Sequence, residues 1–278
     1  MIEEINNSYS IIMSVYQKEL PAYLRAAMDS MLHQTMPTDD FVLMCDGPLT
    51  GELDQVIGSQ QEVWGQRLRV IRLPENRGLA VALREGVSAC RHELIARMDS
   101  DDIAMPDRCE RQLEAYREQP ELSLLSGTIA EFNEDPEHIE NYRRLPETHE
   151  DIVRFAKKRN PMNHMAVMFR KSSVTAAGSY QPIGLFEDYD LWVRMLMQGC
   201  RAANLSEVLV KARIGNGMIA RRGGLSYAED CLRLQKRFYR AGFISLPEAV
   251  MNSVIRGGVS LVPSGAREAF YKKVLRKG

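Results

Sequence analysis

Four short apolar runs, separated by helical patterns, occupy the first hundred residues of the chain. The runs are Ser10–Tyr16, Phe41–Cys45, Leu68–Ile71 and Leu94–Ala96. Each is short enough for a buried strand, whereas segments such as 79–89 repeat their apolar positions with a helical period. Strands that alternate with helices predict an α/β fold, with a mostly parallel, Rossmann-like sheet covered by helices on both faces.

Polar side chains follow all four predicted strands. Tyr16, Asp46, Asn76 and Asp99 each stand at or just beyond the end of a run. In open α/β sheets, ligands collect outside the carboxyl ends of the parallel strands. The sequence therefore predicts one binding rim to which these four residues contribute.

Three acids stand close together after the fourth run, in the stretch 98–102. Asp99, Asp101 and Asp102 would repel one another and would be costly to desolvate. A divalent cation removes that cost, and oxygen ligands suit Mg²⁺ or Mn²⁺, which are usually shared with substrate phosphates. The stretch points to a nucleotide or sugar-nucleotide enzyme. The alternative is that Asp101 or Asp102 caps the helix expected from Pro106.

Composition excludes several classes of protein. The chain has 278 residues and a formal net charge of -1, which gives no argument for nucleic-acid binding. No apolar run approaches the ~20 residues of a membrane span, and the first residues lack a secretory signal. Five widely spaced cysteines without a C-x-x-C pair fit a reduced, cytoplasmic setting.

The second half of the chain is less regular. Strands are expected at 165–169 and 208–212, and helices at 189–198, 225–241, 247–255 and 266–275. A glycine-bounded loop carries Arg221 and Arg222, which could close on a diphosphate or simply be solvated. The basic C-terminus could rest on the inner face of the cell membrane or stay in solvent. The oligomeric state is left open.

Six motifs occur in an order that resembles a known family. They are residues 10–16, the helix end 31–35, Asp46-Gly47, Asn76 to Ala80, Met98 to Asp102, and Phe186 to Trp192. This order is similar to that of family 2 glycosyltransferases with a GT-A fold, of the kind that builds bacterial exopolysaccharide, capsule or lipopolysaccharide. The resemblance covers roughly residues 8–215. It implies a glycosyltransferase domain over 1–215 and a C-terminal helical extension over 216–278.

The resemblance assigns nucleotide-sugar-binding roles to the rim. Asp46 matches the acid that contacts the nucleotide base, and Tyr16 matches the position beside base and ribose. Asn76, Arg77 and Gly78 match the segment that closes over the nucleotide. Cys45 stands where many members have a further acid, and Pro48 where they have a hydroxyl residue, so the identity of the base is left undecided.

The resemblance also assigns metal and catalytic roles. Asp99 and Asp101 match the D-x-D pair, with Asp101 as the direct metal ligand and Asp99 shared between ribose and metal. Asp188, or Glu187 beside it, matches the general base. A carboxyl beside another carboxyl and aromatic rings can have a raised proton affinity. The alternative is that these acids serve the first turn of the helix that follows.

These residues lead to one expected function and two alternatives. We expect a metal-dependent, inverting glycosyltransferase that moves one sugar from a nucleoside diphosphate sugar to a bacterial surface-glycan acceptor, a glycan or a lipid-linked saccharide. The Q-x-x-R-W segment of processive synthases is absent, which favours a single transfer. The alternatives are a sugar-phosphate nucleotidyltransferase and a non-catalytic nucleotide-sugar-binding protein. His164 could reach the acceptor or a phosphate, or could have a structural role only.

Overall fold

The computed structural model describes residues 8–214 and 224–261, with side chains as far as residue 257. The strands are β1 (Tyr9–Val15), β2 (Asp40–Cys45), β3 (Leu68–Arg72), β4 (Leu94–Asp99), β5 (Ile103–Ala104), β6 (Leu122–Phe132), β7 (Ile139–Arg143), β8 (Met168–Arg170) and β9 (Arg201–Arg213). The helices are α1 (Pro21–Leu32), α2 (Gly51–Trp64), α3 (Leu79–Ala89), α4 (Arg108–Glu118), α5 (His149–Ala156), α6 (Lys171–Ala176), α7 (Glu187–Met197), α9 (Leu225–Arg240) and α10 (Leu246–Leu261).

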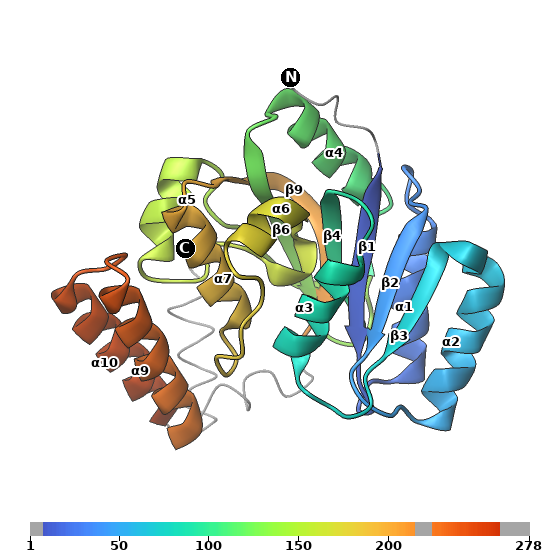
Figure 1. Ribbon diagram of the computed structural model, residues 1–278, viewed down its shortest axis with the longest axis horizontal. Coiled ribbons are helices and arrows are strands. Elements are labelled where there is room, and N and C mark those ends of the chain that lie inside the picture. Colours follow the sequence, from blue (N-terminus) through green and yellow to red (C-terminus); the bar gives the residue numbers. More distant parts are fainter. Residues whose placement is uncertain (1–7, 215–223, 262–278) are drawn as a thin grey trace.

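The strands of the described residues join in a nine-stranded sheet at the centre of the molecule (Figure 1). Its order is β3-β2-β1-β4-β8-β6-β9-β5, with β7 paired to β6. The first four strands are parallel, whereas β8 runs antiparallel between β4 and β6. The predicted α/β sheet is confirmed, with its parallel half in the first hundred residues.

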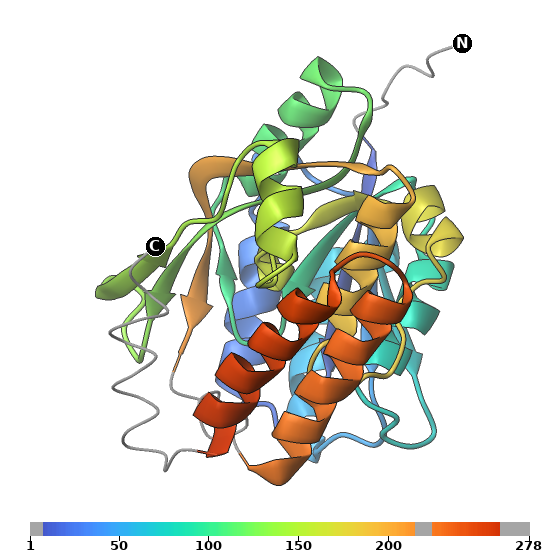
Figure 2. The ribbon, with the colours of Figure 1, turned by 90° about the vertical axis from the view of Figure 1, so that its left-hand side faces the viewer.

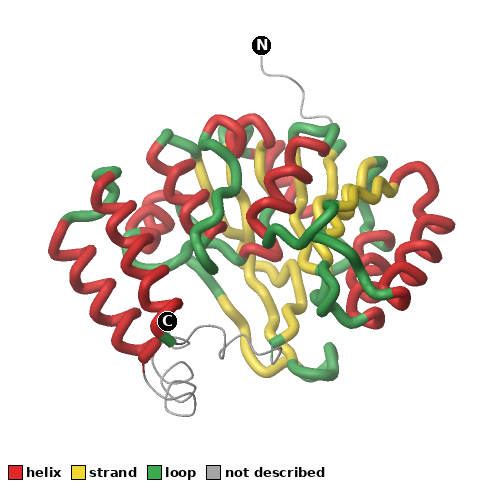
Figure 3. Tube along the Cα trace, turned by 60° about the horizontal axis from the view of Figure 1, so that its bottom comes forward, coloured by secondary structure: helices red, strands yellow, loops and turns green. Residues whose placement is uncertain are grey.

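Helices cover both faces of the sheet (Figure 3). Because side chains alternate along a strand, Ile11 and Met13 of β1 pack into the hydrophobic cluster under α1, α2 and α4. Ile12 points to the opposite face, where it joins the cluster that includes residues of α3 and α7, among them Trp192. Strands β1, β2 and β4 are therefore buried on both sides, which explains their largely apolar sequences, whereas the edge strand β3 is only half-buried.

Helices α9 and α10 form an antiparallel hairpin at the edge of the molecule farthest from α2 (Figures 1 and 2). The hairpin is joined to the hydrophobic cluster of α7, because Phe238 packs edge-on against Tyr189 with ring centroids 5.1 Å apart. The predicted division of the chain between residues 215 and 216 falls within residues 215–223, outside the described ranges, and stays a prediction. No helix among the described residues is both long and apolar enough to cross a membrane.

Elements of the second half differ in detail from the expected ones. The strand expected at 165–169 is a 3-10 turn, His164–Ala166, followed by β8, and the helix expected from Tyr189 begins at Glu187. Strand β9 begins seven residues earlier than expected and pairs with β6, which the sequence did not predict. The helix expected at 266–275 lies outside the described residues.

Candidate active site

Two loops touch at the end of the parallel half of the sheet. The Asp46 carboxylate accepts the backbone N–H groups of Arg77 at 2.7 Å and Gly78 at 3.0 Å, and the Asn76 side chain donates to the Asp46 carbonyl at 3.1 Å. Gly47 has a φ of +87°, and a Cβ there would lie 2.5 Å from the Asn76 nitrogen. Asp46 therefore holds the loop after β3 in position, while its contact with a nucleotide base stays a prediction.

The remaining predicted rim residues lie next to these loops. Tyr16 follows β1 and is 40% exposed, which leaves its ring accessible at the rim. Gly78 is the N-cap of α3, and its φ of +86° is a backbone conformation that favours glycine. Arg221 and Arg222 lie outside the described residues.

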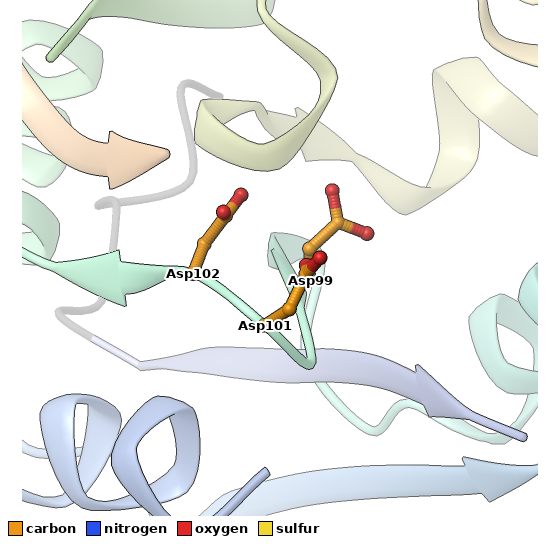
Figure 4. A group of neighbouring side chains, drawn as sticks. All are labelled: Asp99, Asp101 and Asp102. Atoms are coloured by element: carbon orange, nitrogen blue, oxygen red, sulfur yellow. The ribbon is translucent and has the colours of Figure 1, made fainter. Parts of the chain in front are cut away.

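The three acids after β4 converge, as Figure 4 shows. One oxygen from each of Asp99, Asp101 and Asp102 lies within 4.8 Å of the others. Asp102 is buried and accepts the backbone N–H of Arg213 at 2.7 Å. Burial, followed by the charges of the other two acids, raises the pKa of Asp102 well above its usual range. The capping alternative is wrong, because the N-cap of α4 is Asp107.

A buried arginine compensates part of this charge. Arg97 of β4 is 2% exposed and forms a bidentate pair with Asp99, with Nη1 2.7 Å from Oδ2 and Nη2 on Oδ1. Burial is the largest influence and acts to lower the pKa of Arg97, but the charge and hydrogen bonds of Asp99, together with Tyr180 and Asp102, outweigh it and raise that pKa. The Arg97 Nε has no hydrogen-bond partner within the described part of the chain.

The donor set fits a divalent cation. One oxygen from each of the three acids converges in a partly buried corner, where a cation would relieve their mutual repulsion. Carboxylate oxygens are the ligands that Mg²⁺ and Mn²⁺ prefer. Asp101 and Asp99 would hold such an ion, and Asp102 would lie beside it.

A second acidic group stands at the start of α7. Asp188 Oδ2 accepts the side-chain amide of Asn160 at 2.5 Å, and Oδ1 accepts the backbone N–H of Tyr189 at 2.7 Å. Burial raises the pKa of Asp188, although these two hydrogen bonds and Arg97 act in the opposite direction. Its carboxylate is therefore fixed in direction and has an increased proton affinity, as a general base requires.

The neighbouring acids of α7 have different environments. Burial, with the Asp188 charge, raises the pKa of Glu187 to about 7. Asp190 is fully buried and pairs with Arg194 and Arg237, each at 2.8 Å. Asp190 therefore has a structural role, whereas Glu187 and Asp188 lack any such ion pair with a described arginine.

His164 lies between Asp188 and the aromatic rings of Tyr180 and Trp192. Its Nδ1 is 3.9 Å from Asp188 Oδ2, its Nε2 is 3.0 Å from the Tyr180 hydroxyl, and its ring meets Trp192 edge-on at 5.9 Å. Burial, with the nearby Arg97 charge, lowers the pKa of His164 well below its usual value. The imidazole is therefore neutral at pH 7, so one of its ring nitrogens donates a hydrogen bond and the other accepts one.

Comparisons with known proteins identify the family of this chain. The model of the family "Glycosyl transferase family 2" matches residues 10–174. A beta-1,3-galactosyltransferase of Escherichia coli, named for UDP-Gal and alpha-D-GlcNAc-diphosphoundecaprenol, is 35% identical, with 97% of each chain covered. The amylovoran biosynthesis glycosyltransferase AmsE of Erwinia amylovora is 37% identical over 97% of this chain and 100% of its own.

The chain belongs to glycosyltransferase family 2. An uncharacterized glycosyltransferase of Haemophilus influenzae is 39% identical over 97% of this chain and 99% of its own. Membership in this family decides for a glycosyltransferase over a nucleotidyltransferase.

Solved structures share the fold. S. aureus TarS residues 1–349, in complex with UDP-GlcNAc, has a TM-score of 0.67 at 14% identity, covering 96% of this chain and 76% of that one. The mannosyltransferase PcManGT of Pyrobaculum calidifontis, in complex with GDP-Man and Mn²⁺, has a TM-score of 0.64 at 15% identity, covering 97% and 81%. The fold of this family 2 glycosyltransferase is therefore GT-A.

Two residues of the site were missed in the sequence analysis. Arg97 interrupts an apolar strand immediately before the acids, and a charge inside a buried strand was the available signal. Asn160 carried no local signal, because it meets Asp188 only through the fold. Arg213 also lies beside the acids, where its contacts are with the protein. Its guanidinium lies 3.7 Å from the centre of the Tyr23 ring and donates to the Asp101 carbonyl at 3.1 Å.

Proposed function

We propose that this family 2 glycosyltransferase transfers one sugar from a nucleoside diphosphate sugar to a lipid-linked saccharide of a bacterial surface glycan, with inversion at the anomeric carbon. The observation that carries the proposal is the position of Arg97 between two acidic groups. Its guanidinium pairs with Asp99 and also acts electrostatically on Asp188. A leaving-group site and a base site therefore share one buried charge.

The donor would be held at the rim. The loop of Asn76 and Gly78, fixed by Asp46, would close over the nucleotide beside Tyr16. Mg²⁺ or Mn²⁺ held by Asp101 and Asp99 would neutralise charge on the departing diphosphate. The Mn²⁺ complex of the structural relative PcManGT supports such an ion.

The base would act on the opposite side of the anomeric carbon. Asp188 takes the proton of the acceptor hydroxyl, the acceptor oxygen forms a bond to the anomeric carbon, and the bond from that carbon to the diphosphate oxygen breaks. The electron pair of that bond leaves with the diphosphate. Asn160 and the Tyr189 N–H hold the carboxylate still, so that its approach to the hydroxyl is defined before the acceptor binds.

The acceptor class is supported by the relatives. The E. coli galactosyltransferase, 35% identical over nearly the whole chain, is named for a diphosphoundecaprenol-linked acceptor, and AmsE for amylovoran biosynthesis. Both are similar to this chain over 97% of its length, which includes α9 and α10. A lipid-linked saccharide at the inner face of the cell membrane is therefore the acceptor class that we propose.

A transfer assay tests the proposal. Labelled nucleoside diphosphate sugars would be offered with a synthetic GlcNAc-diphospholipid, with Mn²⁺ or Mg²⁺ or with EDTA. We expect a product with inverted anomeric configuration that forms only with the metal. Asp107→Asn, at a half-buried acid that precedes α4 and pairs with Arg111, is the matched control for Asp101→Asn. Equal transfer in EDTA, or product with retained configuration, would contradict the proposal.

A further inference from the structure

The outer faces of α9 and α10 carry most of the exposed apolar side chains of the described residues. Eight of the fourteen large hydrophobic side chains that are exposed there belong to these two helices. Their exposed fractions range from 45% to 73%, and we call this set the apolar hairpin face. A contiguous apolar surface of this kind marks an interaction site, whereas single exposed residues do not. The set is Leu225, Leu232, Tyr239, Leu246, Val250, Met251, Val254 and Ile255.

The outward side of α10 is apolar along its described length. Val250 and Val254 are one turn apart and 55% and 65% exposed, while Asn252 between them is buried. The two charged residues of the described part of α10 are occupied elsewhere, because Glu248 binds Ser245 and Arg256 donates to a backbone carbonyl of the α5 end. A helix that faces only solvent would carry polar residues on this side.

The exposed apolar residues of α9 continue this surface. Leu225, Leu232 and Tyr239 are spaced by seven residues and therefore lie in one line along the helix. Gln235, on the side of α9 next to this line, accepts a hydrogen bond from Asn252 of α10 at 3.0 Å. The line thus runs along the seam with α10, on the side away from the core. Figure 2 looks onto the hairpin from that direction.

A basic row borders the apolar hairpin face. Residues 231–247 contain four arginines and lysines and no acid. These four line a hollow of about 580 Å³ beside Pro182 and Ile183; they are Arg233, Lys236, Arg237 and Arg240. Arg233 and Arg237 have carboxylate partners, whereas Lys236 and Arg240 are exposed and form no ion pair with a described residue.

We propose that the hairpin docks on an anionic lipid bilayer. The apolar hairpin face enters the boundary between headgroups and acyl chains, and Lys236 and Arg240 contact lipid phosphates. A second copy of the chain is a poorer occupant, because a two-fold interface would bring basic row against basic row. The chain beyond residue 261 carries five further lysines and arginines and no acid except Glu268, so its charge also repels this row.

The start of the docked hairpin lies close to the candidate base. The ring of Tyr227, in the first turn of α9, lies 5.3 Å from the ring of Phe186, which directly precedes Glu187. A lipid-linked acceptor could therefore reach Asp188 without leaving the membrane. This consequence rests on the proposed function, whereas the docking itself does not.

Vesicle co-sedimentation tests the docking. The full-length protein would be mixed with vesicles of phosphatidylethanolamine and phosphatidylglycerol, or with phosphatidylcholine vesicles. We expect binding to the anionic vesicles that weakens with salt, and a loss of at least about tenfold in the partition coefficient for Val250→Asp with Val254→Asp. Lys236→Glu with Arg240→Glu should lower it by about tenfold as well, through charge alone. Val63→Asp on α2, at a site 57% exposed, is the matched control and should bind as the unaltered protein does.

Donor hydrolysis, measured without acceptor or vesicles, separates this proposal from the proposed function. We expect the four hairpin substitutions to leave hydrolysis unchanged, which also reports that the variants fold. Docking is overturned if the unaltered protein ignores anionic vesicles. It is equally overturned if light scattering shows a dimer that Val250→Asp with Val254→Asp dissociates, or if all variants bind equally. If the protein binds anionic vesicles but transfers no sugar, the proposed function is contradicted and the docking is not.

Discussion

The two acidic groups of the site are built differently, although each contains adjacent carboxyls. Asp99, Asp101 and Asp102 lie at the end of a strand, and a guanidinium already holds one of them. Glu187 and Asp188 lie at the start of a helix, where amide donors and burial define their state. Burial raises the pKa of acids in both groups, Asp102 in the first and Glu187 and Asp188 in the second. What differs is the arrangement, because three carboxylates converge in the first group, whereas hydrogen bonds from Asn160 and the Tyr189 N–H orient a single carboxylate in the second.

The sharpest test of this contrast removes the base. Asp188→Asn keeps the size of the side chain but cannot take a proton, so transfer should fall by about two to four orders of magnitude. Nucleotide binding should stay within about threefold, because the rim and the strand-end acids are unchanged. Steady-state kinetics and calorimetric titration with UDP or GDP would measure the two quantities. Transfer at the unaltered rate would show that Glu187 or another group is the base.

Removing the shared arginine should affect both groups together. Arg97→Met leaves Asp99 without its buried partner, and breaking such a pair costs about 3–5 kcal/mol in the free energy of unfolding. Urea unfolding measures that loss. A loss no larger than that of an exposed pair, such as Arg111→Met, would mean that the pair of Arg97 with Asp99 contributes no more than a surface ion pair.

The metal side of the comparison is tested by Asp101→Ala. We expect transfer to fall by about two to three orders of magnitude and Mn²⁺-dependent binding of nucleoside diphosphate to disappear. The pH dependence of transfer should stay, because Asp188 is untouched. Full metal-dependent nucleotide affinity in this variant would exclude Asp101 as a ligand.

The smallest expected effect concerns Glu187. The pKa of Glu187 is about 7 in the folded protein, compared with an ordinary value of 4.5. Between these two pH values the folded state therefore holds a proton that the unfolded state has released, and this stabilises the fold. That stabilisation is complete below pH 4.5 and is lost as pH rises through 7. Glu187→Gln stays neutral, so relative to the unaltered protein it should gain about 1–3 kcal/mol between pH 5 and pH 8. Urea unfolding at both pH values measures the difference, and no change would contradict the burial of this charge.

The sequence was informative where a local pattern decides the structure. Tyr16, Asp46, Asn76 and Asp99 follow four apolar runs, and parallel strands bring their carboxyl ends to one edge whatever the loops do. The acids at 99–102 are close in the chain and so had to be close in space. The roles of all these residues in binding and catalysis stay predictions.

What the sequence did not reveal depends on contacts between distant segments. Strand β6 was missed because its run, with Ser126, Gly127 and Thr128 at its middle, lacks a clear period, and burial between β8 and β9 stabilises it instead. Asn160 reaches Asp188 across 28 positions of the chain. The apolar hairpin face was missed too. The sequence shows which residues of a helix are apolar, but not which side of that helix packs against the core and which side stays exposed.

The location of Arg97 in a central strand has a consequence for the rate of transfer. Strand β4 is hydrogen-bonded on both sides, to β1 and to β8, so its guanidinium cannot swing as a loop residue would. When the same reaction takes place in water, the dipoles of the water molecules must rotate as the diphosphate gains charge and the acceptor oxygen loses its proton. Here Arg97 already pairs with Asp99 and acts electrostatically on Asp188 before either substrate arrives. Under the proposed function, part of the reorganisation that slows the reaction in solution would therefore be completed when the protein folds.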